Sequence, residues 1–390
     1  MADHRTRQPW FRASLTCFAI VIAAAACSSA SSSRDSASTT NPTTSAAPYA
    51  KRGPYAAGYT TLRLADGRRV VVWYPATRNG IKGRPRQVVD IASFLTPALQ
   101  AQIPAANRVL YAANAFAGAT PVTNKGAFPL VLFSHGFAGY PEQSVAITTH
   151  LASWGFVVAA PNHVERSLDG LLGTAAAGMT ASTGTDVLQA TLAAAEAASS
   201  GTDVLRGLVD HQRVAVIGHS AGAGSAYTLA SENPQIKSFI AYSVGFGGQG
   251  GPAPAPPKQP GMVMLGTTDG IIEPASSREV YQSMNPPKYL VEIADAGHLV
   301  FSDICLIGRD SGGITGIARA LKLPIPESLL KLGSDGCTPD HPLPENAFPA
   351  INQLTVGFLR WTLGIDEQPV GLSTAAVAGL GGDVTVSHQG

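Results

Sequence analysis

The chain has 390 residues, of which 45% are hydrophobic and 14% are charged. This composition supplies enough apolar material for a large core and excludes a chain that is disordered throughout. The 27 Lys and Arg residues and the 26 Asp and Glu residues give a formal net charge of +1. Neither a basic field for nucleic acid nor an acidic tail is therefore expected.

The first 26 residues have the pattern of a secretory signal peptide. Three arginines precede an apolar run of small residues at 13–26, which is too short to span a bilayer comfortably. The run ends in A-A-A-C at residues 24–27, which resembles the lipobox of bacterial lipoproteins. That resemblance implies that Cys27 carries lipid. The alternative is cleavage by an ordinary signal peptidase, because Ala24 and Ala26 also satisfy that enzyme.

Residues 28–48 have the composition of a flexible tether, because 12 of these 21 residues are Ser or Thr. We therefore expect a signal peptide at 1–26, a lipidated Cys27 with its tether at 27–48, one domain at 49–365 and a weakly ordered tail at 366–390. Removal of residues 1–26 leaves a formal charge of −1, which does not predict electrostatic attachment to a membrane. The expected location is outside the cytoplasm, either secreted or anchored to the bacterial membrane through lipid.

The domain contains eight apolar or β-rich runs that predict strands. The first two are joined around Asp66-Gly67, which indicates a hairpin, and the others are short apolar runs typical of buried parallel strands. The predicted strands cover residues 59–64, 69–74, 130–133, 156–160, 214–217, 239–243, 262–265 and 289–293.

Helical stretches separate most of these strands. They cover residues 142–154, 186–210 with an interruption near Gly201, 221–232, 275–284 and 346–363, while residues 93–117 are expected to be partly helical. The alternation predicts an α/β fold with a mostly parallel eight-stranded sheet and helices on both faces.

A candidate nucleophile lies where a predicted strand meets a predicted helix. Residues 218–222 read G-H-S-A-G, the G-x-S-x-G pattern of a nucleophile elbow, in which a sharp turn exposes the serine. The two glycines allow the neighbouring backbone to approach closely. Ser220 is therefore the candidate nucleophile, and it needs a base because a serine hydroxyl is a poor nucleophile alone.

The candidate base and acid follow the last two predicted strands. His298 comes shortly after the strand at 289–293, and Asp269 follows the strand at 262–265 within G-T-T-D-G. The chain order Ser220, Asp269, His298 is the order expected for this arrangement. Asp295 and Asp303 are nearer to His298 in sequence, but neither ends a strand that points at the site.

The oxyanion hole needs two backbone N–H groups directed at the developing negative charge. We expect one from Ala221, directly after the nucleophile, and one from Phe137, in the S-H-G-F loop after the strand at 130–133. His135 in that loop is either a structural residue or a second base. Phe137 and Tyr140 are candidates for lining an acyl pocket. Residues 163–166 (H-V-E-R) either contact substrate or form a salt-bridged surface turn.

Cys305 and Cys337 remain once Cys17 leaves with the signal peptide and Cys27 carries lipid. In an oxidising compartment they predict a disulfide, which would contribute about 3–4 kcal/mol by closing its loop. Two free thiols are the alternative. No C-x-x-C pair or H-x-x-x-H spacing occurs, so no metal site is predicted.

The V-L-F-S-H-G-F segment at 131–137, the elbow at 218–222, the acid loop at 266–270 and A-G-H at 296–298 together resemble the α/β-hydrolase superfamily. The likeness is to secreted bacterial esterases of the dienelactone-hydrolase-like, platelet-activating-factor-acetylhydrolase-like and cutinase-like groups. It covers residues 58–365. It implies the α/β-hydrolase fold and ester hydrolysis without any cofactor. Dienelactone hydrolases proper use a cysteine where Ser220 stands, which argues against that activity.

The resemblance implies a serine carboxylester hydrolase that forms an acyl-enzyme on lipid, short-chain or polyester esters. Two alternatives stay open. In the first, the protein is an acyltransferase that uses the same triad to pass an acyl group to an alcohol of the cell envelope. In the second, it is a non-catalytic binding lipoprotein built on a hydrolase scaffold. The expected partners are an ester substrate and, through Cys27, a membrane. Residues 93–117, 173–184 and 305–337 are candidates for pocket walls.

Overall fold

The computed structural model describes residues 47–247 and 253–390. Cys27, the expected signal peptide at 1–26 and the expected tether up to residue 46 lie outside the described residues. The described residues belong to one compact unit. Within the described ranges, no helix combines the length and the apolar character needed to cross a membrane.

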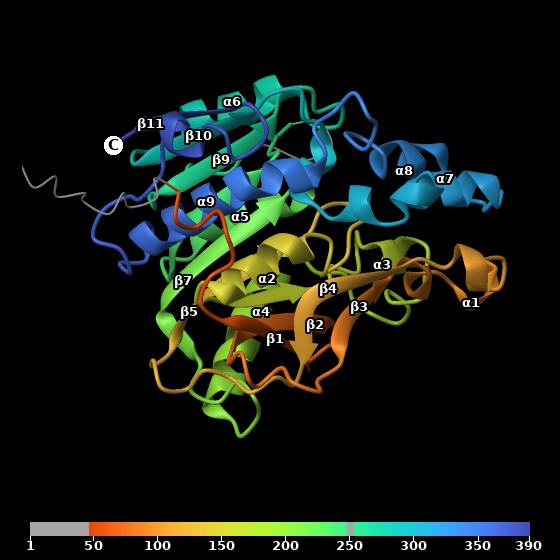
Figure 1. Cartoon of the computed structure of the whole chain (residues 1–390), viewed down its shortest axis with the longest axis horizontal. Coiled ribbons are helices and arrows are strands. Elements are labelled where there is room, and N and C mark those ends of the chain that lie inside the picture. Colours follow the sequence, from red (N-terminus) through yellow and green to blue (C-terminus); the bar gives the residue numbers. More distant parts are fainter. Residues whose placement is uncertain (1–46, 248–252) are drawn as a thin grey trace, which may run out of the picture. The chain divides into compact units, whose positions relative to one another are not determined.

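One mixed sheet runs through this unit (Figure 1). Its strands in the described residues are β1 (Ala56–Arg63), β2 (Arg69–Ala76), β3 (Arg86–Asp90), β4 (Leu110–Ala117), β5 (Phe128–Ser134), β6 (Val157–Pro161), β7 (Val209–His219), β8 (Ile236–Tyr242), β9 (Gly261–Gly266), β10 (Lys288–Ile293) and β11 (Val384–Gln389). The spatial order is β11-β10-β9-β8-β7-β5-β6-β2-β1-β4-β3. Every neighbouring pair from β6 through β10 is parallel, which confirms the mostly parallel sheet.

Helices cover both faces of the sheet. The five longest are α2 (Val145–Ser153), α4 (Gly184–Ser200), α5 (Ala221–Glu232), α6 (Pro274–Ser283) and α9 (Pro344–Thr362). Side chains alternate across β5, so Val131 and Phe133 share a core with α2 and α9, whereas Leu130 and Leu132 share a core with α4, α5 and α6. This alternation gives a three-layer structure with a core on each side of the sheet.

All eight predicted strands are present, but the sheet has eleven rather than eight. The three additional strands, β3, β4 and β11, lie at its two ends. Residues 93–117 were expected to be partly helical, and they end in β4, where Ala113 and Ala115 are buried but Leu110 is exposed. Partly exposed strands near the end of a sheet carry little apolar periodicity, so the pattern does not reveal them.

The expectation of a weakly ordered tail at 366–390 is wrong for its last part. Within it, α10 (Thr374–Val377) precedes β11, which pairs antiparallel with β10 over six residue pairs from Val384 to Gln389. The segment is rich in glycine and only Val384 of the strand is buried. The strand is ordered by backbone pairing with β10, and sequence composition gives no sign of such pairing.

Two segments form a cap beyond the carboxyl ends of the central strands. Residues 91–109 contain α1 (Pro97–Gln100), and residues 304–333 contain α7 (Gly313–Ala320) and α8 (Glu327–Leu332). Figure 1 shows α1, α7 and α8 together with α3 (Leu168–Leu171) at one end of the sheet. We call residues 91–109 and 304–333 the cap.

Candidate active site

Ser220 lies in a strained turn between β7 and α5. Its backbone angles are φ 57° and ψ −124°, in a region that residues with a side chain rarely adopt. A Cβ on Gly218 would lie 2.0 Å from the carbonyl oxygen of Gly222, and one on Gly222 would lie 2.0 Å from that of Ser134. Only glycine therefore fits at these two positions of the motif, and the turn has the geometry of a nucleophile elbow.

Asp269 and His298 form a buried pair at the ends of β9 and β10. His298 Nδ1 lies 2.9 Å from Asp269 Oδ2, and the residues are 1% and 6% exposed, respectively. The other carboxylate oxygen accepts hydrogen bonds from the N–H groups of Ile271 and Ile272. Burial acts to raise the pKa of Asp269, but the hydrogen bond and charge of His298 and the two backbone donors hold it below its ordinary value.

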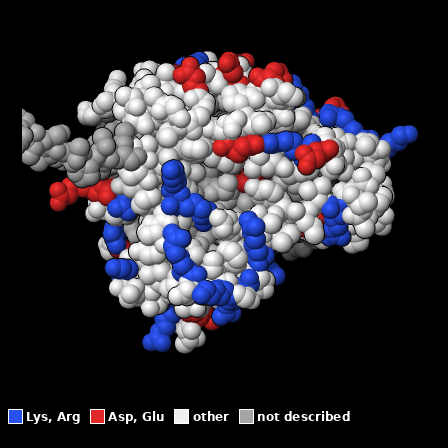
Figure 2. All heavy atoms as spheres, viewed as in Figure 1, with Lys and Arg blue, Asp and Glu red and all other residues white. Residues whose placement is uncertain are grey.

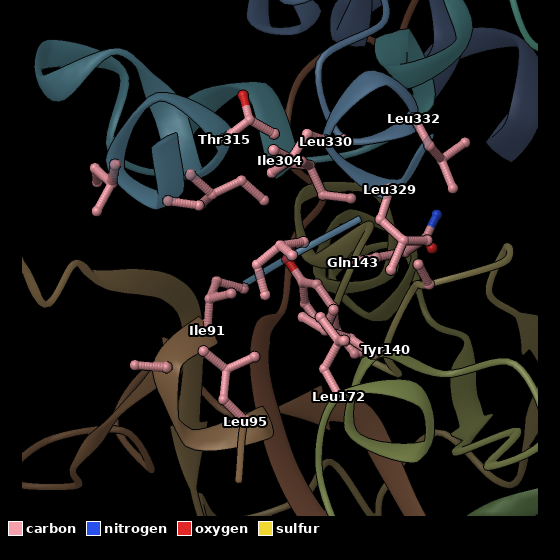
Figure 3. A pocket seen from close by; sticks show the side chains of 18 of the residues that line it. Ile91, Leu95, Tyr140, Gln143, Leu172, Ile304, Thr315, Leu329, Leu330 and Leu332 are labelled. Atoms are coloured by element: carbon pink, nitrogen blue, oxygen red, sulfur yellow. The ribbon is translucent and has the colours of Figure 1, made fainter. Parts of the chain in front are cut away.

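Ser220 and His298 line the same cavity, which encloses about 1110 Å³ including space open to solvent. Among the described residues, no hydrogen bond joins their side chains. Figure 3 shows aliphatic side chains from the cap and from around Tyr140 pointing into this cavity. The larger aliphatic residues of the cap that line the cavity are Ile91, Leu95, Ile103, Val109, Ile304, Ile314, Ile317, Leu323, Ile325, Leu329, Leu330 and Leu332. Phe137 and Tyr140 also line it, as the sequence suggested.

The backbone around the expected oxyanion hole is held from both sides. The N–H of Gly136 donates to Gln143 Oε1, and that of Ala138 donates to the carbonyl of Arg166. Between them, the N–H of Phe137 donates no hydrogen bond within residues 47–247 and 253–390, and the same holds for Ala221 at the start of α5. Two unoccupied donors beside the serine are what an oxyanion hole requires.

Gln143 and His219 join three loops of the site, and the sequence analysis gave neither a role. Gln143 Nε2 donates to His219 Nδ1 at 2.9 Å, and His219 Nε2 donates to the carbonyl of His298 at 3.0 Å. Burial, and then the nearby charge of His298, lowers the pKa of His219 to about 3, so the ring is neutral. The only available signal was the position of His219 inside the elbow motif.

Asp335 is a second residue that the sequence analysis missed. Its Oδ1 accepts the backbone N–H of His298 at 2.6 Å and that of Gly270 at 3.3 Å, so it bridges the loops that carry the base and the acid. Two residues later, Cys337 forms the disulfide with Cys305 that the sequence predicted. The disulfide thus ties the segment that holds Asp335 to the chain that follows His298.

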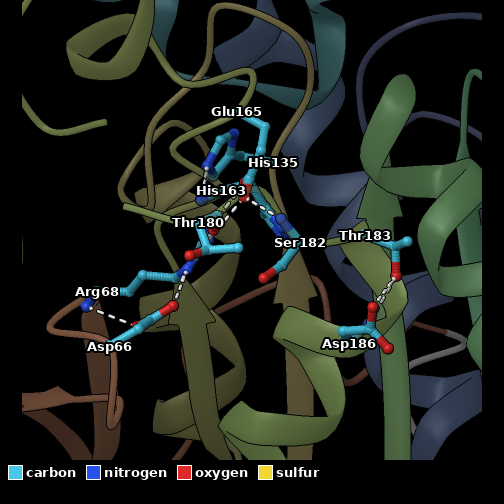
Figure 4. A network of polar contacts seen from close by, with 9 residues as sticks. All are labelled: Asp66, Arg68, His135, His163, Glu165, Thr180, Ser182, Thr183 and Asp186. Carbon is cyan, nitrogen blue, oxygen red and sulfur yellow. Dashed lines mark hydrogen bonds and ion pairs between the residues drawn. The ribbon is translucent and has the colours of Figure 1, made fainter. Parts of the chain in front are cut away.

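His135 and the segment at 163–166 form a buried network away from the cavity (Figure 4). His135 Nε2 accepts the N–H of His163, and its Nδ1 donates to the carbonyl of Gly136. Burial, followed by the charge of Arg166, lowers the pKa of His135 to about 3. These contacts favour the structural role over that of a second base.

The same network contains ion pairs between a buried arginine and two partly exposed acids. Arg68, which is 1% exposed, donates two hydrogen bonds to Glu165 and one to Asp66. None of the residues 163–166 lines the cavity. The segment is therefore a salt-bridged turn, as the second alternative expected, rather than a substrate contact.

The nearer acids named as alternatives are placed elsewhere. Asp303 is buried and accepts hydrogen bonds from Tyr111 Oη and the N–H of Ala146, while the backbone N–H of Asp295 donates to Thr267. In the part of the chain that the structure describes, no group of three or more His, Cys, Asp or Glu side chains is arranged to hold a metal ion.

A mostly parallel sheet flanked by helices, with a serine at the elbow after its central strand, defines the α/β-hydrolase fold. A solved structure agrees with this: the chain is similar to a ferulic acid esterase from Streptomyces cinnamoneus, with a TM-score of 0.57 and 21% identity, over 87% of this chain and 98% of that one. The model of a family described as chlorophyllase matches residues 98–248, which include Phe137 and Ser220 and end before Asp269. No curated protein matches the chain.

Proposed function

We propose that this protein is a serine carboxylester hydrolase in which Ser220, His298 and Asp269 act as nucleophile, base and orienting acid. The observation that carries the proposal is the buried His298–Asp269 pair beside the cavity that Ser220 also lines. The names chlorophyllase and ferulic acid esterase, borne by the matched family and the similar structure, support ester hydrolysis.

In the proposed mechanism, Ser220 Oγ attacks the ester carbonyl carbon while His298 Nε2 accepts the hydroxyl proton. Asp269 holds the Nδ1–H tautomer and stabilises the imidazolium that forms. The N–H groups of Phe137 and Ala221 stabilise the oxyanion. His298 then gives the proton to the leaving alcohol, and a water molecule repeats the sequence on the acyl-enzyme and regenerates Ser220.

The proposed substrate is an ester with a bulky apolar group. The side chains that the cap contributes to the cavity are almost all aliphatic. Burial of a hydrocarbon group against such walls stabilises the complex by about 25 cal/mol per Å² of apolar surface removed from water. A short acetyl group would leave most of this apolar surface without a partner. Long aliphatic or large apolar esters are therefore the class that the cavity favours.

The test is a series of p-nitrophenyl esters from acetate to palmitate, with Ser220→Ala as the blank. We expect kcat/KM to rise from acetate to the medium and long chains, and Ser220→Ala to lose roughly 10⁶-fold in kcat. Equal, low rates for the wild type and Ser220→Ala on every ester would refute the proposed hydrolase. A steep decline of kcat/KM for esters longer than acetate would refute only the proposed bulky apolar substrate and would leave the proposed hydrolase standing.

We also propose that the protein acts outside the cytoplasm, held by lipid on Cys27. The sequence pattern at 24–27 supports this, and so does the Cys305–Cys337 disulfide, because disulfides persist in oxidising compartments. Growth of the host cells with a labelled fatty acid tests it. Label should enter the wild type and not Cys27→Ser, and label in neither protein would leave plain secretion as the account.

A further inference from the structure

A second hollow lies outside the candidate active site. It is a groove between the first described residues, β3 and β4, and the helices α2 and α9, and none of its lining residues lines the cavity at Ser220. Its polar lining residues are Lys51, Arg52, Arg86, Tyr111, Asn114, Thr149, His150 and Asn352. The lining contains basic and neutral side chains but no carboxylate. We call this hollow the basic groove.

The arginines at the basic groove lack acidic partners, unlike most others in the fold. Eight arginines elsewhere in the described residues form ion pairs: Arg68, Arg69, Arg108, Arg213, Arg278, Arg309, Arg319 and Arg360. In contrast, Arg52 and Arg86 in the groove, and Arg78 beside them, have no carboxylate partner within residues 47–247 and 253–390. Figure 2 shows Lys and Arg side chains gathered over β1–β4 on this face.

Neutral oxygens hold the two groove arginines in place. Arg52 donates to Thr149 Oγ1 at 3.2 Å, to the Thr149 carbonyl at 3.0 Å and to the Asn114 carbonyl at 3.4 Å. Arg86 Nε donates to the Ala113 carbonyl at 2.7 Å. These contacts use part of each guanidinium and neutralise none of its charge. The groove walls, and then the charges of Arg78 and Arg86, lower the pKa of Arg52 to about 10. An anion in the groove would relieve this repulsion.

Other lining residues complete a polar site without opposing the charge. Asn352 is 8% exposed, and its side-chain oxygen has no hydrogen-bond partner within the described residues. His150 Nε2 donates to the Tyr49 carbonyl, and burial lowers the pKa of His150 to about 4, so this ring adds no charge. Tyr111 Oη donates a hydrogen bond to Asp303, which does not line the groove. Burial raises the pKa of Asp303 to about 7.

We propose that the basic groove binds a phosphate-bearing anion through the guanidinium groups of Arg52 and Arg86. A guanidinium matches the geometry of phosphate oxygens with two parallel N–H donors, and two of them suit a phosphate better than a single carboxylate. The groove encloses about 890 Å³ including space open to solvent, which admits a substituted phosphate such as a lipid headgroup as well as the free ion. The groove also begins at residues 50–52, just after the expected tether. A headgroup at a membrane would therefore be within reach of an anchored protein.

The test uses the full chain carrying Cys27→Ser, so that no lipid is attached, and two probes. Calorimetry measures binding of inorganic phosphate. Sedimentation measures binding to phosphatidylcholine vesicles with and without phosphatidylglycerol, and the neutral vesicles report the contribution of the apolar residues 13–26. Arg52→Gln/Arg86→Gln removes the site. Arg63→Gln/Arg206→Gln removes the same charge from exposed arginines outside the groove.

We expect the groove variant to bind roughly tenfold or more weakly than the parent to at least one probe, and the control variant to bind like the parent. Loss with phosphatidylglycerol vesicles alone identifies a lipid headgroup as the ligand, and loss with phosphate alone identifies a soluble phosphate. Equal losses in the two variants, or no saturable binding of either probe by the parent, would overturn the proposal. If the double variant fails to fold, Arg86→Gln alone serves, because Arg86 is exposed and makes one hydrogen bond. Ester turnover should be unchanged in each variant.

Discussion

Gln143 illustrates why some residues of the site escape sequence analysis. Ser220, Asp269 and His298 each follow a strand of the sheet, so chain order and local motif were sufficient to nominate them. Gln143 acquires its position through contacts with Gly136 and with His219, which is 76 residues away. Nothing in the local sequence reports such contacts. Asp335 is similar, since its carboxylate meets the backbone of His298 only after the cap has folded.

Replacement of Asp269 by Asn should separate the chemistry from the architecture. Asn has nearly the shape of Asp, but its amide N–H would donate to His298 Nδ1 and so favour the His298 tautomer with its proton on Nε2, which cannot act as the base. We therefore expect kcat to fall by about 10⁴-fold while KM changes little. Steady-state kinetics on the best p-nitrophenyl ester measures this. As a control, Asp295→Asn should retain wild-type kcat. A wild-type kcat in Asp269→Asn would remove Asp269 from the triad.

The acid sensitivity of the fold should also depend on Asp269. The pKa of this buried carboxyl is lower in the folded protein than its ordinary value of 3.8. Its contribution to stability is therefore fully present above that ordinary value and is lost as the pH falls through the lower folded value. Urea unfolding at pH 7, 5 and 3 should show the wild type losing more stability between pH 5 and 3 than Asp269→Asn. Identical losses would contradict this role of the carboxylate.

At the scale of elements, the sequence revealed the central strands because each is a short apolar run bounded by turn residues. It missed β3, β4 and β11, where only some side chains are buried and pairing to a neighbouring strand orders the backbone. The cap was predicted only as possible pocket walls. Its helices α7 and α8 are short, and their packing over the cavity depends on long-range contacts. Short elements of this kind have little stability of their own.

Removal of the disulfide tests the coupling between the cap and the base loop. Cys305→Ser/Cys337→Ser should lose about 3–4 kcal/mol of stability, by the chain-entropy estimate. It should also lower kcat, because Asp335 would hold the loops of His298 and Gly270 less firmly. Reductant should produce the same two effects in the wild type and none in the double variant. A destabilised variant with wild-type kcat at a temperature where it is folded would disconnect the disulfide from the site.

At the scale of the whole molecule, the charged side chains are unevenly distributed, although the net charge is near zero. The formal charge of +1 predicted no electrostatic partner, yet the fold gathers unpaired arginines in the basic groove and pairs most of the others. The apolar cavity and the basic groove have no lining residue in common. The α/β-hydrolase fold was predictable from the alternation of strands and helices. The walls of the apolar cavity were predicted in part, from residues 93–117 and 305–337. The basic groove was not, because it is lined by residues far apart in the sequence.

Covalent labelling of the candidate nucleophile tests the central claim most directly. A fluorophosphonate reacts with a serine only when a base and an oxyanion hole activate it. Intact-mass measurement followed by peptide mapping should find one adduct per chain, on Ser220. His298→Ala should slow this reaction strongly, and Ser220→Ala should abolish it. A folded wild-type protein that forms no adduct, or forms it on another residue, would contradict the assignment of Ser220, His298 and Asp269.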